Sequence, residues 1–134
     1  MAEGKMFQLK IITPDRVFYE GEAEMIEMST SDGDVGIYKE HVPTTFIVVP
    51  GVLTIHQGGA TREAALHSGF AEILKEQVVV LAEAAEWPDE IDVERARRAK
   101  ERAQERIQSH AANVDMVRAE LALRRSLVRM KVGH

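Results

Sequence analysis

Apolar and polar residues alternate over residues 6–85, whereas apolar residues recur every three to four positions over the rest of the chain. Phe7, Leu9 and Ile11 share one face of a first predicted strand, which ends at Thr13-Pro14-Asp15. Further strands are predicted at residues 23–29, 35–38, 45–49, 52–56, 62–66, 70–74 and 78–81. Many short strands with no helical pattern between them are typical of an antiparallel sandwich or barrel.

The segments between these strands contain residues that favour tight turns. Ser31-Asp32-Gly33-Asp34 separates two predicted strands, and Lys75-Glu76-Gln77 separates two others. Gly58-Gly59 predicts a hairpin turn, because glycine tolerates the positive φ that such turns require.

The pattern changes at Trp87-Pro88-Asp89-Glu90, where proline ends the alternation and the acidic residues indicate the start of a helix. Asp92 is a favourable N-cap residue for this helix. The residues that follow are mostly charged, apart from a narrow stripe at helical spacing, formed by Ala96, Ala99, Ala103 and Ile107. The first helix is therefore expected to have a small apolar face.

A break at residues 109–113 precedes a second predicted helix, with Asn113 or Asp115 as its N-cap. Its apolar face is broader and comprises Val117, Leu121, Leu123, Leu127, Val128 and Met130. Small residues facing larger ones allow antiparallel helices to pack closely, which predicts a helical hairpin. Because an alanine stripe buries little apolar area, this hairpin should depend on docking to the sandwich, a ligand or another protein.

These patterns predict an α+β fold: an N-terminal antiparallel β-sandwich at residues 1–87, followed by a C-terminal α-helical hairpin at residues 88–134. The chain contains no cysteine, which excludes disulfides, thiolate metal sites and a cysteine nucleophile. No apolar run approaches the roughly 20 residues that span a bilayer. We therefore expect no direct membrane insertion, and any membrane association should occur through a partner.

Charge is distributed unevenly within the net charge of −5. Residues 1–90 carry 6 Lys/Arg against 16 Asp/Glu, whereas residues 91–134 carry 11 against 6. A basic tail can bind nucleic acid, but here acids alternate with the bases and no aromatic residue is available for stacking. We expect no nucleic-acid partner, and instead a tail that docks on an acidic surface or collects phosphates.

No arrangement of residues indicates catalysis. The sequence lacks a phosphate loop ending in Gly-Lys-Ser/Thr and lacks a glycine-rich dinucleotide turn. Its five histidines are scattered without metal-ligand spacing, and His67-Ser68 has no second partner at a spacing typical of hydrolases. We therefore expect neither a metal site nor enzymatic activity.

Arginines form a candidate site in the helical segment. Arg95 and Arg102 are seven residues apart and lie nearly on one face of the first helix, while Arg125 and Arg129 are one turn apart on the second. In an antiparallel hairpin these four guanidinium groups would approach one another. Unpaired, they would repel.

Two explanations relieve that repulsion. Acidic residues nearby, such as Glu94, Glu101 and Glu105, can form salt bridges with the arginines. Alternatively, a polyanionic ligand can be bound bidentately by several guanidinium groups. Taken alone, the composition favours the salt bridges.

Several short motifs occur in a specific order and spacing. They are Thr13-Pro14-Asp15, Gly33-Asp34-Val35-Gly36-Ile37, His41-Val42-Pro43, Ser68-Gly69-Phe70, Leu81-Ala82-Glu83-Ala84-Ala85-Glu86 and Arg118-Ala119-Glu120-Leu121-Ala122-Leu123. Each motif is weak by itself. Together they give the chain a resemblance, over essentially its whole length, to the ε subunit of bacterial F-type ATP synthases.

The resemblance implies a non-catalytic subunit of the central stalk of a proton- or sodium-translocating ATP synthase. Its sandwich of about ten strands would contact the γ subunit and the ring of c subunits, with Ser31 and Asp34 at the ring, although a plain acidic turn is the alternative for this loop. The hairpin would move between a compact form and an extended form that reaches the catalytic α/β head and inhibits ATP hydrolysis. The implied location is the cytoplasmic side of the bacterial cell membrane, as a peripheral protein.

The resemblance also implies ATP as a regulatory ligand, with no cofactor for catalysis and with Mg²⁺ as a possible companion. Many bacterial members carry Ile/Leu-Asp-x-x-Arg-Ala at the first helix, and Ile91-Asp92-Val93-Glu94-Arg95-Ala96 matches it completely. The remaining positions of the implied pocket are Glu86, Arg102, Arg125 and Arg129. Arginines would neutralise phosphates, Asp92 and Glu86 would accept hydrogen bonds, and Ile91 and Ala96 would pack beside the ring.

Two alternatives stand beside this interpretation. One is a purely structural coupling subunit whose hairpin binds no nucleotide. The other is an unrelated small nucleotide sensor, which would be a stable monomer indifferent to γ.

Overall fold

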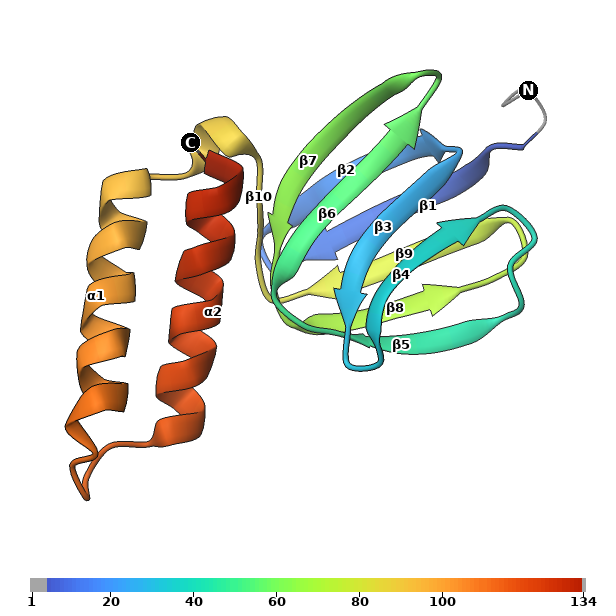
Figure 1. Cartoon of the computed structure of the whole chain (residues 1–134). Coiled ribbons are helices and arrows are strands. Elements are labelled where there is room, and N and C mark those ends of the chain that lie inside the picture. Colours follow the sequence, from blue (N-terminus) through green and yellow to red (C-terminus); the bar gives the residue numbers. More distant parts are fainter. Residues whose placement is uncertain (1–4, 134) are drawn as a thin grey trace.

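The computed structural model describes residues 5–133 and places a β-sandwich beside a pair of helices (Figure 1). The strands are β1 (Phe7–Thr13), β2 (Arg16–Ala23), β3 (Met25–Thr30), β4 (Gly33–Tyr38), β5 (Thr44–Val48), β6 (Gly51–Gln57), β7 (Ala60–Leu66), β8 (Gly69–Ile73), β9 (Gln77–Ala82) and β10 (Ala85–Glu86). A 3-10 helix, η1 (Pro88–Glu90), leads to α1 (Val93–Ser109) and α2 (Met116–Gly133). The predicted order of a sandwich followed by a helical hairpin is confirmed.

All ten strands belong to one continuous sheet in the order β10-β7-β6-β3-β5-β8-β9-β1-β2, with β4 paired to β3. Neighbouring strands are antiparallel except β1 and β9, which run parallel from Gln8 opposite Gln77 to Ile12 opposite Leu81. The expectation of purely antiparallel pairing fails at this pair. Strands so distant in the chain are not joined by a hairpin turn, so their relative direction is not constrained by a short connection.

The strand β2 was missing from the sequence interpretation, and β3 begins at Met25 rather than at Ala23. β2 is the last strand in the sheet order, and among its residues only Phe18 and Ala23 are fully buried. These two residues are five positions apart, an odd spacing, and the pairing of β2 with β1 shifts its register between Ile11 and Ile12. The period-two alternation that identifies a strand is therefore broken here.

Alternate residues of the strands fill the core of the sandwich. Phe7, Leu9 and Ile11 are at most 2% exposed, which confirms that they share one face. Gly58 and Gly59 adopt φ values of +59° and +87° in the turn between β6 and β7, as the hairpin prediction required.

Both helices begin at aspartate caps. The Oδ1 atom of Asp92 accepts a hydrogen bond from the Arg95 backbone N–H at 3.0 Å, and Asp115 does the same for Arg118 at 3.1 Å. His110 closes α1 in the left-handed conformation, with φ of 51°. The predicted Asp92 cap is thus confirmed, and Asp115 rather than Asn113 caps α2.

Small residues occupy the centre of the hairpin on both helices, because Ala96 and Ala103 of α1 and Ala119 of α2 are buried. The broad apolar face predicted for α2 is wrong in part: Val117 is 77% exposed and Leu127 is 46% exposed. Figure 1 shows the reason, since α2 lies between α1 and the sheet. The buried residues of α2 are therefore divided between two opposite faces.

No helix within residues 5–133 combines the length and the apolar character needed to cross a membrane.

Candidate functional site at the junction of hairpin and sheet

A small apolar patch holds α2 on the sandwich. Its buried members are Ala65 of β7 and Val128 and Val132 of α2, and Val52 and Ile91 pack around them while partly exposed. The last turn of α2 also lies against the segment before α1, because a Cβ atom built at Gly133 would be 2.8 Å from Cγ2 of Ile91. Ile91 therefore closes the open end of the hairpin.

Beside this patch, one carboxylate connects the sheet to α2. The Oε1 atom of Glu86 accepts a hydrogen bond from Nε of Arg129 at 2.8 Å and lies 3.1 Å from Nε2 of His67. The His67 side chain is 1% exposed, and its Nδ1 atom is buried with no hydrogen-bond partner among residues 5–133. We call these three residues the latch.

Burial of the Glu86 carboxylate tends to raise its pKa, but the hydrogen bonds from His67 and Arg129 outweigh that effect. The pKa of Glu86 is therefore lowered from the ordinary value of 4.5 for a glutamate. Glu86 is therefore ionised at neutral pH. A negative charge on the sheet meets the positive charge of Arg129 on the hairpin.

A second ion pair lies one turn away along α2. Nη2 of Arg125 donates to Oε1 of Glu83 at 3.1 Å, and this pair is more open, since the Glu83 side chain is 64% exposed. Arg124 makes a further bond to the sandwich through Nε, which donates to the Pro50 carbonyl oxygen at 3.0 Å.

Helical spacing, anchored on one groove between the helices, places the four predicted arginines on one side of the hairpin. Arg106 of α1 and Arg118 of α2 line a common groove, which shows which sides of the two helices meet. On α1, Arg102 is one turn before Arg106 and therefore lies on the same side of the helix. On α2, Arg125 is two turns after Arg118 and lies on the same side as Arg118. We call Arg95, Arg102, Arg125 and Arg129 the arginine flank.

Within the arginine flank, the two helices differ. Arg125 and Arg129 are paired with carboxylates of the sheet, whereas Arg95 and Arg102 are exposed on α1 and have no ion pair among the described residues. The acids proposed to neutralise them do not do so. Glu94 and Glu101 instead form salt bridges with Arg97, on a different side of α1.

The apolar candidates, Ile91 and Ala96, contribute to packing. Ala96 is 4% exposed within the hairpin, and Ile91 is half-buried against α2. The latch residue His67 and the acid Glu83 were not among the candidates from the sequence. The only signals were the His67-Ser68 pair, which lacked a catalytic partner, and the spacing of Glu83 from Glu86 in a motif of small residues.

The segment that leads to the hairpin is fixed to the sandwich by Trp87. The Trp87 ring stacks on Phe18 with the two ring centroids 4.2 Å apart. The guanidinium of Arg62 lies 3.8 Å from the centroid of the Trp87 ring. Arg16 of β2 forms a 2.8 Å salt bridge with Glu90 in η1. The chain is thus held by the sandwich as far as η1.

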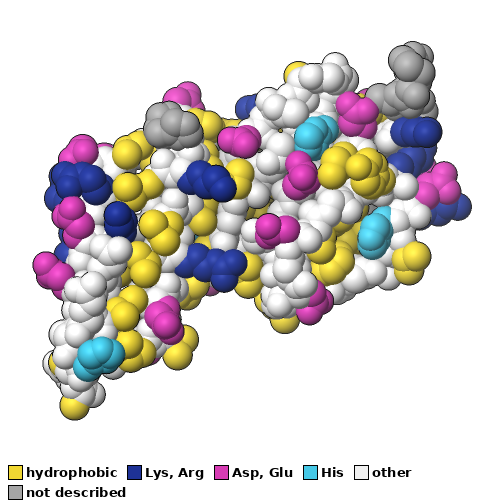
Figure 2. Space-filling model, viewed as in Figure 1, with side chains coloured by type: hydrophobic (Ala, Val, Ile, Leu, Met, Phe, Trp, Pro, Cys, Tyr) yellow, Lys and Arg dark blue, Asp and Glu magenta, His cyan; other side chains and the backbone are white. Residues whose placement is uncertain are grey.

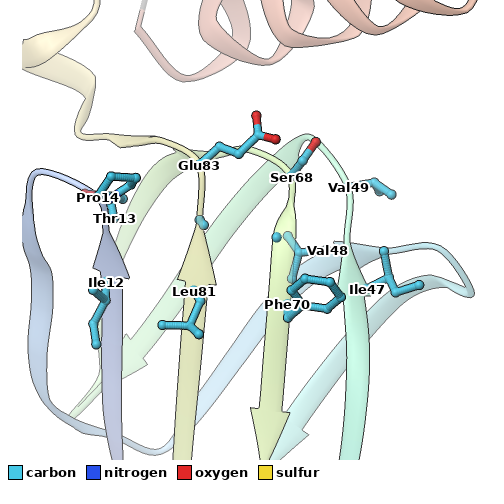
Figure 3. A pocket seen from close by; sticks show the side chains of 12 residues that line it. Ile12, Thr13, Pro14, Ile47, Val48, Val49, Ser68, Phe70, Leu81 and Glu83 are labelled. Atoms are coloured by element: carbon cyan, nitrogen blue, oxygen red, sulfur yellow. The ribbon is translucent and has the colours of Figure 1, made fainter.

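A row of exposed apolar residues crosses four strands on the outer face of the sheet (Figure 3). Ile47, Phe70, Leu81 and Ile12 follow one another in register across β5, β8, β9 and β1. Ile47, Phe70 and Leu81 are 54%, 57% and 51% exposed. They line a groove of about 680 Å³, and such a continuous apolar surface is typical of a protein interface.

The two predicted ring-contact residues are exposed: Ser31 lies in the turn between β3 and β4, and Asp34 lies at the start of β4. Oδ1 of Asp34 accepts a hydrogen bond from the Ser29 hydroxyl at 2.8 Å.

Figure 2 shows basic side chains over the hairpin and along its border with the sandwich, with acidic side chains on both parts of this face. Residues 5–133 contain no group of three or more His, Asp or Glu side chains arranged to hold a metal ion.

Comparison with known proteins divides the chain into two matched regions. Residues 6–88 match the family described as ATP synthase, Delta/Epsilon chain, beta-sandwich domain, and residues 89–133 match the ATP synthase, Delta/Epsilon chain, long alpha-helix domain. Two curated relatives are the ATP synthase epsilon chains of Caldanaerobacter subterraneus subsp. tengcongensis and Ruminiclostridium cellulolyticum. The first is 44% identical over 130 residues, covering 96% of this chain and 94% of the relative. The second is 42% identical over 124 residues, covering 92% of each.

A solved structure has the same fold. A chain in the cryo-EM structure of the Euglena gracilis mitochondrial ATP synthase (OSCP/F1/c-ring) has a TM-score of 0.83 and 24% sequence identity, covering 96% of this chain and 82% of that one.

Proposed function

This chain belongs to the family of ATP synthase delta and epsilon chains, which are non-catalytic subunits, and from that premise we propose that it couples γ to the c-ring and regulates ATP hydrolysis. The complex would be the F-type ATP synthase of a bacterial cell membrane, moving protons or sodium ions. The chain would lie on its cytoplasmic side as a peripheral part of the rotor.

The coupling role is supported by the outer face of the sandwich. The exposed side chains of Ile47, Phe70 and Leu81 form an apolar surface that γ could bind without any change in the fold of the sandwich. The tip of the β3–β4 hairpin, with Ser31 and Asp34, would contact the polar loops of the c-ring. Replacing Phe70 with Asp should prevent co-purification with γ, whereas normal co-purification would contradict this assignment.

The regulatory role is supported by the way the hairpin is docked. Of the residues that the structure describes, three are buried at the apolar patch (Ala65, Val128 and Val132), so the compact form rests on a small surface together with the ion pairs of α2. A ligand that binds the compact form preferentially would shift the population towards it. The extended form would reach the α/β head and inhibit hydrolysis.

The nucleotide proposal rests on the docked hairpin, on which helical spacing places four arginines on one flank and two of them, Arg125 and Arg129, are seen at the border with the sheet. We propose that this flank binds the phosphates of ATP, with Asp92 and Glu86 accepting hydrogen bonds and Ile91 and Ala96 near the ring. Mg²⁺ would be carried by the phosphates, since oxygen atoms are its preferred ligands. The site would report the ATP concentration without hydrolysing ATP.

One observation favours the second candidate, a coupling subunit without a nucleotide site. Arg125 and Arg129 already have carboxylate partners, and these pairs neutralise half of the arginine flank without any ligand. On that account the arginines serve only to dock the hairpin.

Calorimetric titration of the full chain with ATP separates the two candidates, with GTP and ADP as nucleotide controls. We expect one-to-one binding that is weakened about tenfold or more in Arg125→Ala and is unchanged in Arg97→Ala. Arg97→Ala removes the same charge from the side of α1 that lies away from the arginine flank. Absence of heat at millimolar ATP would favour the structural candidate. Turnover of ATP by the isolated chain would contradict a regulatory site.

A further inference from the structure

We propose that Glu83 limits the affinity of the hairpin for nucleotide by competing with phosphate for Arg125. This inference rests on the proposed nucleotide site and adds to it an affinity-determining residue that would not itself contact the ligand. Glu83 lies between β9 and β10, outside the set of residues assigned to the pocket.

The position of Glu83 is set by the sheet. Its backbone N–H donates to the Ser68 carbonyl oxygen at 2.8 Å, so the main chain is fixed where β9 ends. Figure 3 shows its side chain extending beyond the strand ends, in the direction of the helices. From there Oε1 reaches Nη2 of Arg125 at 3.1 Å.

A carboxylate at this place imitates the ligand chemically. Carboxylates and phosphates both present oxygen acceptors to the same guanidinium fork, and a guanidinium binds either by charge-assisted hydrogen bonds. The bond from Arg125 uses Nη2, one of the terminal nitrogens that would face a phosphate. Binding of phosphate by Arg125 therefore requires that Glu83 be displaced or that it share the donor.

Arg129 is held differently. Its bond to Glu86 uses Nε, which is the only nitrogen of Arg129 with a hydrogen bond among the described residues, so the two terminal nitrogens stay available. Glu86 is itself secured by His67, which is 1% exposed. The latch thus orients Arg129 without occupying the nitrogens that a phosphate would need.

The two acids consequently have opposite effects on a ligand. Glu86, 27% exposed and bonded to His67, positions an arginine. Glu83, which is 64% exposed, occupies a terminal nitrogen of Arg125 that a phosphate would need. An exposed pair of this kind contributes little to docking, and its competition with phosphate is correspondingly modest, about two- to fivefold in affinity.

Glu83→Gln tests the competition, because it removes the charge and preserves the shape of the side chain. The matched control is Glu76→Gln, which makes the same charge change next to the opposite end of β9. Calorimetry with ATP and with inorganic tripolyphosphate should give affinities about two- to fivefold higher for Glu83→Gln than for either the original chain or Glu76→Gln. Circular dichroism of each variant checks that its fold is retained.

A second comparison tests whether the effect passes through Arg125. In an Arg125→Ala background, Glu83→Gln should produce no gain, because there is no guanidinium left to release. If Glu83→Gln still raised the affinity for ATP in that background, the inference would be overturned. The effect would then come from general electrostatic repulsion of ATP by Glu83 rather than from competition for Arg125.

The remaining outcomes separate this inference from the proposed function. If the original chain binds ATP and Glu83→Gln binds no more tightly, the inference is wrong and the nucleotide site stands. If only Glu83→Gln binds, the inference is supported and the natural site is blocked by Glu83. If neither chain binds, both proposals fail.

Discussion

The sandwich and the hairpin are stabilised in different ways. The sandwich encloses a continuous core in which side chains as large as Leu9, Ile11 and Leu53 are at most 1% exposed. The hairpin has alanines at its centre, and within the described part of α2 it is Val128 and Val132 that are buried on the sheet beside Ala65. One chain thus combines a firmly packed platform with a sparsely packed element, and this difference supports the conformational switch that we propose.

The largest expected effect is in the platform. Ile55→Ala removes a side chain that is 1% exposed, and it should lower the free energy of unfolding by about 2–5 kcal/mol in urea denaturation. Leu81→Ala truncates a 51% exposed residue of the same sheet and should change the free energy of unfolding by less than about 0.5 kcal/mol. Equal effects of the two substitutions would show that the core is assigned wrongly.

Undocking of the hairpin should be separable from unfolding of the sandwich. Val128→Asp places a charge in the docking patch, where burial without a partner is unfavourable, and should release α2 while the urea midpoint of the sandwich stays nearly unchanged. Hydrogen exchange of α2 amides measures the release. Leu127→Asp, at the adjacent and 46% exposed position, is the control and should leave α2 protected.

Acid should weaken docking through the latch. The pKa of Glu86 is lowered in the docked form, so its contribution is present above about pH 4.5 and is lost as the pH falls through the lowered value. Glu86→Gln should weaken docking at pH 7 by about 1–3 kcal/mol, because Gln keeps an acceptor oxygen but removes the negative charge that strengthens both hydrogen bonds. Hydrogen exchange of α2 as a function of pH should then lose the acid-dependent step that this carboxylate causes.

A smaller effect is expected at the start of α1. Asp92→Ala removes the cap on the Arg95 N–H and should destabilise the helix by about 1 kcal/mol, with faster exchange of amides in its first turn. Asp92→Asn retains the capping oxygen and should restore the protection. If Asn behaves like Ala, the charge rather than the cap is responsible.

Local chemistry explains which features could be predicted from the sequence. The two glycines of the β6–β7 turn and the Asp92 cap depend on neighbouring residues only, and both were predicted correctly. The strand β2 escaped detection because its register against β1 shifts, which places its buried residues Phe18 and Ala23 at an odd spacing and breaks the alternation.

The contacts of the candidate site depend on the docking of α2, which local patterns do not encode. The spacing of Arg125 and Arg129 placed them on one face of a helix, but it gave no information on their partners. Glu83, Glu86 and His67 come from other segments of the chain, and they meet the arginines only because the last helix folds back on the sheet.

Hydrogen exchange of the full chain with and without ATP tests the central claim most directly, because it follows both regions in one experiment. At saturating ATP we predict slower exchange for amides of α1 and α2 and unchanged exchange for the core strands β3 and β6. Identical exchange of both helices at millimolar ATP would contradict the claim that the docked hairpin senses nucleotide.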